Sequence, residues 1–81
     1  MSTRIALIGI IVENPDITDE LNRILHENHE YIVGRMGVPY RQRNINIISI
    51  VVDASNDVIS AMSGKLGLLD GCSVKTVYSK S

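Results

Sequence analysis

The stretch "MSGKLGLLDGCSVKTVY" contains a glycine–lysine pair that could belong to a phosphate-binding loop. A Walker-type loop requires glycine, any four residues, glycine, lysine and then serine or threonine. Here Lys65 is followed by Leu66, and the position five residues before Gly64 is Ile59. The stretch instead predicts the end of a helix, a left-handed Gly67 after that end, and a turn into a strand.

Two histidines, His26 and His29, are three residues apart in a segment that is expected to be helical. This spacing places both side chains on one helix face, where they could bind a transition metal ion. Cys72 or a second subunit would have to complete such a site. Alternatively, both histidines are solvated at a helix end, where positive charge is favourable. A metal-binding sensor is therefore the alternative function that we consider.

The segment "GRMGVPYRQRN" brings arginines, a tyrosine and glycines together around a predicted hairpin. Guanidinium groups, with backbone N–H groups exposed at glycine, can bind a carboxylate or a phosphate. The alternative is a twisted or bulged edge strand with solvated charges. We expect a ligand site formed by Arg35, Gly37, Tyr40, Arg41 and Arg43.

The sequence indicates no catalytic centre. A reactive thiolate needs a histidine or cationic neighbour, and none can be assigned to Cys72. Ser60 and Ser63 have no visible base with which to form a nucleophilic triad. We therefore predict that the chain is not an enzyme; the sequence does not identify a cofactor.

The chain has 81 residues, which predicts one small domain over residues 1–81. With 8 basic and 9 acidic residues, it lacks the basic excess of a nucleic-acid-binding protein, and we expect no direct contact with nucleic acid. Its longest apolar run, Ile5 to Val12, is too short to span a membrane, and no signal peptide opens the chain. We expect a cytoplasmic protein that does not insert into a membrane.

Hydrophobic periodicity predicts four strands and two helices. The strands are expected over residues 4–12, 31–40, 45–52 and 73–78. The first helix is expected to start at an Asn14 cap with Pro15 in its first turn, and to run to about His29. The second is expected to be capped by Ser55 or Asn56.

This order, β-α-β-β-α-β, predicts an α+β, ferredoxin-like fold with a four-stranded antiparallel sheet and two helices on one face. That topology places the strands over 4–12 and 45–52 in the centre of the sheet. Pro39 and Lys75 then fall on the two edge strands, where proline is tolerated and a charge discourages unwanted pairing.

Both central strands are apolar on both faces, although two helices can cover only one face of the sheet. A bare second face would exceed the apolar patch of about 300–600 Å² that is usual for a monomer. We therefore predict that another copy of the chain covers this face, either face to face or by edge-to-edge extension of the sheet, in a dimer or a tetramer. The alternative is an apolar face that a monomer tolerates. The residues that we assign to the subunit interface are Ile8, Ile10, Val12, Ile48 and Ile50.

The segments "GRMGVPY" and "NINIISIVVDASNDVISAMSGKLGLLDGCSVKTV" resemble the small family of iron-only hydrogenase system regulators. The resemblance extends from the first strand to Val77. Members of this family look like stand-alone ACT-like domains and are similar to the C-terminal sensing domain of nickel-responsive repressors. The resemblance implies a single, oligomeric ACT-like regulatory domain that senses a small molecule or binds a protein partner, without enzyme activity.

Three features of the related proteins are not found in this sequence. Nickel-responsive repressors hold their metal with histidines and cysteines on the sheet, and the second and third strands here contain neither. Amino-acid-binding ACT domains commonly have Pro-Gly after the first strand, whereas here Pro15 is followed by Asp16. The chain is also too short to hold a ribbon-helix-helix DNA-binding segment beside the predicted domain. The ligand and the regulated target are therefore not predicted.

Overall fold

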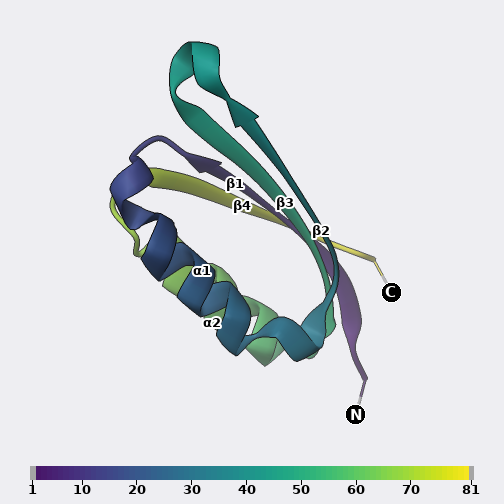
Figure 1. Cartoon of the computed structure of the whole chain (residues 1–81). Coiled ribbons are helices and arrows are strands. Elements are labelled where there is room, and N and C mark those ends of the chain that lie inside the picture. The colour runs from purple at the N-terminus through teal and green to yellow at the C-terminus, as the bar shows by residue number, and fades with distance from the viewer. Residues whose placement is uncertain (1, 81) are drawn as a thin grey trace.

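The computed structural model describes residues 2–80 as four strands and two α-helices. The strands β1 (Arg4–Val12), β2 (Ile32–Tyr40), β3 (Ile45–Ala54) and β4 (Cys72–Tyr78) form one antiparallel sheet in the order β2-β3-β1-β4. The helices α1 (Thr18–Glu27) and α2 (Asn56–Gly67) lie on the same face of this sheet (Figure 1). The predicted α+β, ferredoxin-like fold is thus confirmed, and residues 1 and 81 of the predicted domain lie outside the described residues.

The predicted cap Ser55 starts α2, whereas the predicted cap Asn14 starts a 3₁₀ turn and α1 itself begins at Thr18, three residues later than predicted, without a side-chain cap. The Asn14 side chain accepts a hydrogen bond from the Asp16 amide at 3.0 Å and opens a 3₁₀ turn, Pro15–Ile17, which leads into α1. Ser55 caps α2 by accepting a hydrogen bond from the Val58 amide at 3.3 Å. Within residues 2–80, neither helix has the length and hydropathy that a membrane-spanning helix needs.

The first helix ends at Glu27, two residues before the predicted end at His29. The Asn28 side chain donates to the Ile24 carbonyl at 2.8 Å and so satisfies one of the free carbonyls of the last turn. A 3₁₀ turn, His29–Tyr31, then leads directly into β2.

The prediction of a left-handed residue at Gly67 was wrong, because Gly67 is the last residue of α2. Leu68, whose backbone is in the right-handed helical region, is the C-cap residue of α2. Its backbone N–H donates a hydrogen bond to the Gly64 carbonyl at 3.1 Å. The positive φ occurs later in the turn, at Gly71, where φ is 106°. The carbonyl of Gly71 accepts the amides of Glu13 and Asn14 at 2.8 and 3.0 Å, and so joins this turn to the end of β1.

The core lies between the sheet and the two helices. It consists of aliphatic side chains and one methionine; its largest fully buried members are Ile8, Ile10, Leu21, Leu25, Ile50, Val52, Ile59, Met62 and Leu66. No polar or charged residue among the described residues is buried with them.

The structure contradicts the predicted subunit interface. Ile8, Ile10, Val12, Ile48 and Ile50 face the helices and are at most 8% exposed, so the chain's own core already covers them. The exposed apolar side chains of the central strands are the alternate ones, including Ile5, Leu7, Ile11 and Ile47. Successive side chains of a strand point to opposite faces of the sheet. Because the prediction placed the helices on the wrong face, it assigned the core residues to the interface and the exposed residues to the core.

Candidate functional site

The sheet face opposite the helices is apolar and carries no covering element within residues 2–80, as Figure 1 shows. We call it the open face. The register places residues of all four strands on it, and its large hydrophobic side chains are 41–64% exposed. These side chains are Ile5, Leu7, Ile11, Met36, Val38, Tyr40, Ile47 and Val77.

Residues opposite each other in the register form rows across the open face. Val38 lies opposite Ile47, and Ile47 lies opposite Ile11, which makes one continuous apolar row. In the next row Gly9 lies opposite Ser49, and these small residues leave a shallow hollow of about 310 Å³. By register the charged residues of this face within residues 2–80 are Asp53, near the end of β3, and Lys75, which lies opposite Gly9 on the edge strand β4 and lines the hollow.

A second candidate site lies on the other side of the sheet, between α1 and β2. We call it the α1–β2 groove. It is a hollow of about 260 Å³, and its polar side chains are Thr18 and Asn22 from α1, Arg35 from β2 and Asn46 from β3. Its other lining residues are apolar or glycine: Val12, Leu21, Gly37, Val38, Pro39 and Ile48.

Gly37 forms part of the wall of this groove because it lacks a side chain. It lies opposite Ile48 in the register and therefore on the helix-facing side of β2. A Cβ atom added to Gly37 would meet nothing within 4 Å. The glycine thus leaves space beside Arg35 that a larger residue would fill.

Arg35 is the cation of the groove. One of its terminal nitrogens donates to Oδ1 of Asn22 at 3.0 Å, so the amide holds the guanidinium group between helix and strand. No carboxylate of residues 2–80 forms an ion pair with it. Arg23, on the outer face of α1, is instead paired with Glu20 and Glu27.

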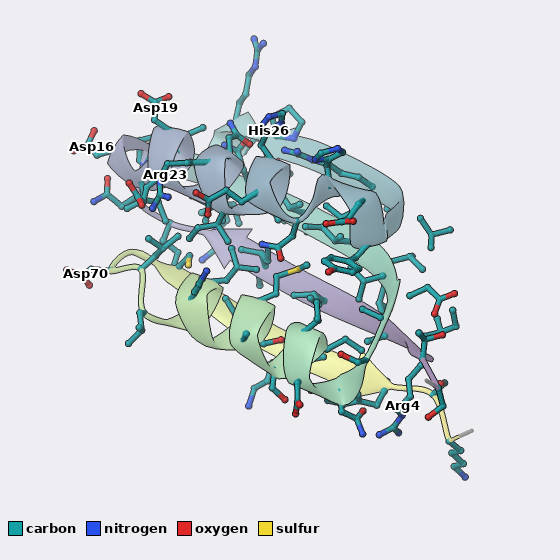
Figure 2. The ribbon with its side chains drawn as sticks, turned by 90° about the horizontal axis from the view of Figure 1, so that it is seen from below. Arg4, Asp16, Asp19, Arg23, His26 and Asp70 are labelled. Atoms are coloured by element: carbon teal, nitrogen blue, oxygen red, sulfur yellow. The ribbon has the colours of Figure 1, made fainter. Side chains whose placement is uncertain are left out.

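Both histidines lie next to Arg35. They line an adjoining hollow of about 320 Å³, which shares Asn22 and Arg35 with the α1–β2 groove. The two imidazole rings stack with centroids 5.4 Å apart and planes inclined by 19°. Figure 2 places His26 on α1 away from Asp16, Asp19 and Asp70, which gather where α1 begins and α2 ends.

The geometry does not favour a metal at the two histidines. Nδ1 of His29 lies 2.8 Å from the His26 carbonyl, which can only accept, so this nitrogen carries the proton. Cys72 lies opposite Val12 in the register, at the other end of α1, and cannot join them. Within residues 2–80, no group of three His, Cys, Asp or Glu side chains is placed to hold a metal ion.

Four of the five residues predicted to form one ligand site line two adjoining hollows. Arg35 and Gly37 are in the α1–β2 groove, and Tyr40 and Arg41 border a smaller hollow of about 70 Å³, which shares Val12, Pro39 and Asn46 with the groove. Arg43 is exposed in the 3₁₀ turn Arg41–Arg43 and lines neither hollow. The sequence prediction did not include the groove residues Thr18, Asn22 and Asn46. The i, i+4, i+8 spacing of Thr18, Asn22 and His26 is the signal that could have identified the helix side of this groove.

Cys72 is a structural thiol at the start of β4. Its Sγ atom donates weakly to the carbonyls of Leu66 and Leu69, at 3.5 and 3.8 Å. Burial raises the pKa of the Cys72 thiol, and the negative charge of Glu13 raises it further. A raised pKa leaves less thiolate at neutral pH, which is the opposite of what a catalytic cysteine requires.

Comparison with known protein families identifies the family of this chain. Residues 4–76, which run from the first residue of β1 into β4, match the family model of the TM1266-like proteins. The chain belongs to the TM1266-like family. That family carries the description "Iron-only hydrogenase system regulator, putative". The resemblance seen in the sequence is therefore confirmed.

A solved structure extends the likeness over almost the whole chain. It is described as "The structure of uncharacterized protein TM1266 from Thermotoga maritima". The two chains are 39% identical, with a TM-score of 0.93, and the match covers 98% of this chain and 100% of the other. No curated protein matches this chain.

Proposed function

We propose that this chain is a non-catalytic regulatory module of the iron-only hydrogenase system, which works as a homo-oligomer and senses a small molecule. Membership of the TM1266-like family supports the link to that system. The open face is the observation that carries the proposal, because an uncovered apolar sheet face needs a partner.

The size of the open face is suited to a stable protein interface. Four strands spaced about 4.8 Å apart, paired over roughly eight residues of about 3.3 Å each, span roughly 500 Å² in projection. The accessible surface of this face is larger than its projected area because side chains protrude from it. A standard interface buries about 800 Å² of accessible surface per partner. The chain exposes 5482 Å² of accessible surface, whereas a folded monomer of this mass is expected to expose about 4,800 Å². The chain therefore exposes more surface than a typical monomer, as expected of a subunit that packs against a partner.

A second copy of this chain is the occupant that we propose for the open face. Apolar side chains dominate the face, and its charged residues Lys75 and Asp53 lie on the edge strand β4 and near the end of β3. Their charged groups can therefore stay in solvent when an identical face packs on it. A two-fold axis would bring each apolar row against an apolar row of the other copy. The hollow at Gly9 and Ser49 offers space for side chains from the opposing sheet.

A matched pair of variants tests the proposed assembly. Ile47→Lys places a charge in the middle of the open face and is expected to yield a monomer in multi-angle light scattering at about 100 µM, where the wild type is an oligomer. Leu68→Lys is the control, because Leu68 is 86% exposed after the end of α2, away from the open face. A monomeric wild type, or an Ile47→Lys variant that stays assembled, would contradict the proposal.

The same variants connect assembly to regulation. In cells that encode this chain and an iron-only hydrogenase, deletion of the gene is expected to change the amount of hydrogenase protein. Wild type and Leu68→Lys should restore that amount, whereas Ile47→Lys should not. Unchanged hydrogenase levels after deletion would remove the regulatory link, whatever the oligomeric state.

A further inference from the structure

We infer that the α1–β2 groove binds a small monocarboxylate with a short aliphatic body. The inference deepens the proposed function and rests on it, since such a ligand is what the module would sense. Four properties of the groove lead to this ligand class: its charge, its donors, its apolar lining and its size.

The charge of the groove favours an anion. Arg35 is the one cation that lines it, and its guanidinium group has no carboxylate partner within residues 2–80. Arg23 shows the contrast, because two glutamates of α1 already satisfy that arginine. The planar guanidinium group matches a carboxylate in geometry, and a charge-assisted pair is stronger than a neutral hydrogen bond.

The neutral polar groups beside Arg35 can supply further donors. Asn22 accepts from Arg35 through Oδ1, which leaves its amide nitrogen available to a ligand. Thr18 and Asn46 add a hydroxyl and a second amide to the lining. Because no aspartate or glutamate lines this hollow or the adjoining one, an ammonium group would find no charged partner there. This favours a simple carboxylate over an amino acid.

The remaining lining is apolar. The exposed Pro39 borders the groove, and the buried side chains of Val12, Leu21 and Ile48 lie beneath it, which suits an aliphatic group better than a sugar or a second phosphate. The groove has a volume of about 260 Å³, slightly below the roughly 300–1,000 Å³ of pockets that hold drug-sized ligands, and two further hollows adjoin it. Arg35 is the one cation that lines the groove, so the several phosphate charges of a nucleotide would lack charged partners in it. An inorganic phosphate would leave the apolar lining without a contact.

The experiment is a titration of the intact protein followed by amide NMR spectra, with 3-methylbutanoate as the probe. Saturable shifts are expected at Asn22, Gly37 and their neighbours, with a dissociation constant below about 1 mM. The neutral amide of the same acid, the zwitterion leucine and inorganic phosphate are run in parallel, and each is expected to bind more weakly. An amide, leucine or phosphate that binds as tightly as 3-methylbutanoate would overturn the assigned ligand class.

Two variants locate the site. Arg35→Gln removes the charge but keeps a hydrogen-bonding group near Asn22, and should weaken binding roughly tenfold to a hundredfold. Lys65→Gln makes the same change in net charge on the last turn of α2 and should leave binding unchanged. Gly37→Val fills the groove and should abolish binding, while the melting temperature stays equal or rises, since valine suits a strand and its Cβ meets nothing within 4 Å.

The outcomes separate this inference from the proposed function. An oligomer that shows no saturable shifts, or an Arg35→Gln variant that binds like wild type, overturns the assignment of the groove and leaves the assembly proposal intact. A monomeric wild type that still binds 3-methylbutanoate in the groove overturns the assembly and supports the site.

Discussion

At the scale of single residues, Cys72 has the titratable side chain whose surroundings make the clearest prediction. Its thiol contacts two carbonyls at the end of α2, and burial together with Glu13 raises its pKa above the ordinary value of 9.0. We expect iodoacetamide to alkylate Cys72 at pH 8 roughly tenfold or more slowly in the folded protein than in urea, because less thiolate is present and access is reduced. Mass spectrometry of quenched samples measures both rates, and equal rates would contradict the structural role.

The raised pKa also fixes the sign of a stability effect. A thiol that binds its proton more tightly when folded contributes stability below its ordinary pKa, and this contribution is lost as the pH rises through the folded-state pKa. The unfolding free energy of the wild type should therefore fall relative to Cys72→Ala above about pH 9. The alanine variant cannot titrate at this position, so it cancels the titration of the other groups.

At the scale of secondary-structure elements, the turn between α2 and β4 depends on Gly71. Its φ of 106° is unfavourable for residues with a side chain, and a Cβ atom there would lie 2.5 Å from Cβ of Asn14, the cap of the first helical segment. Gly71→Ala should thus lower the unfolding free energy by about 2 kcal/mol or more, as measured by urea denaturation.

A second glycine provides the control for that measurement. Gly64 lies inside α2, has no positive φ, and a Cβ atom added there meets nothing within 4 Å. Gly64→Ala should raise the unfolding free energy by about 0.5–1 kcal/mol, because alanine is the better helix former. If both variants behaved alike, the strain assigned to Gly71 would be wrong.

The elements themselves could be predicted well from the sequence, because periodicity and caps are local. Ser55 specifies the start of α2, Asn14 specifies the 3₁₀ turn that leads into α1, and the β1 bounds agree with the structure at both ends. The covered face of the sheet could not be read in the same way, because both central strands are apolar on both sides. Gly9 and Ser49, small residues that face each other on the open side, were the available signal that this side is not the packed core.

The candidate site was predictable only in part, because it is assembled from several elements. Arg35 and Gly37 were found from residue type and spacing in one strand. The site also needs α1 to pack beside β2, and this long-range contact brings Asn22 to Arg35. Arg41 and Arg43 were grouped with Arg35 because they are close in sequence; the structure places Arg41 at a hollow that adjoins the groove and Arg43 in the exposed turn outside both hollows.

At the scale of the whole molecule, the open face makes stability depend on protein concentration. If a second copy covers that face, unfolding includes dissociation, and mass action stabilises the folded oligomer as concentration rises. For a dimer of two such chains, each tenfold increase in concentration should raise the melting temperature by about 3–5 °C. Differential scanning calorimetry over a hundredfold range of concentration measures this shift.

The interface variants show whether any such shift comes from the open face. Ile47→Lys should melt at a temperature that does not depend on concentration, because its folded form is already a monomer. Leu68→Lys should keep the wild-type slope, since its side chain lies after the end of α2 and away from the sheet. A wild type that melts at the same temperature throughout the range would mean that the exposed rows around Ile47 are tolerated by a monomer, and the regulatory module would then act as a single chain.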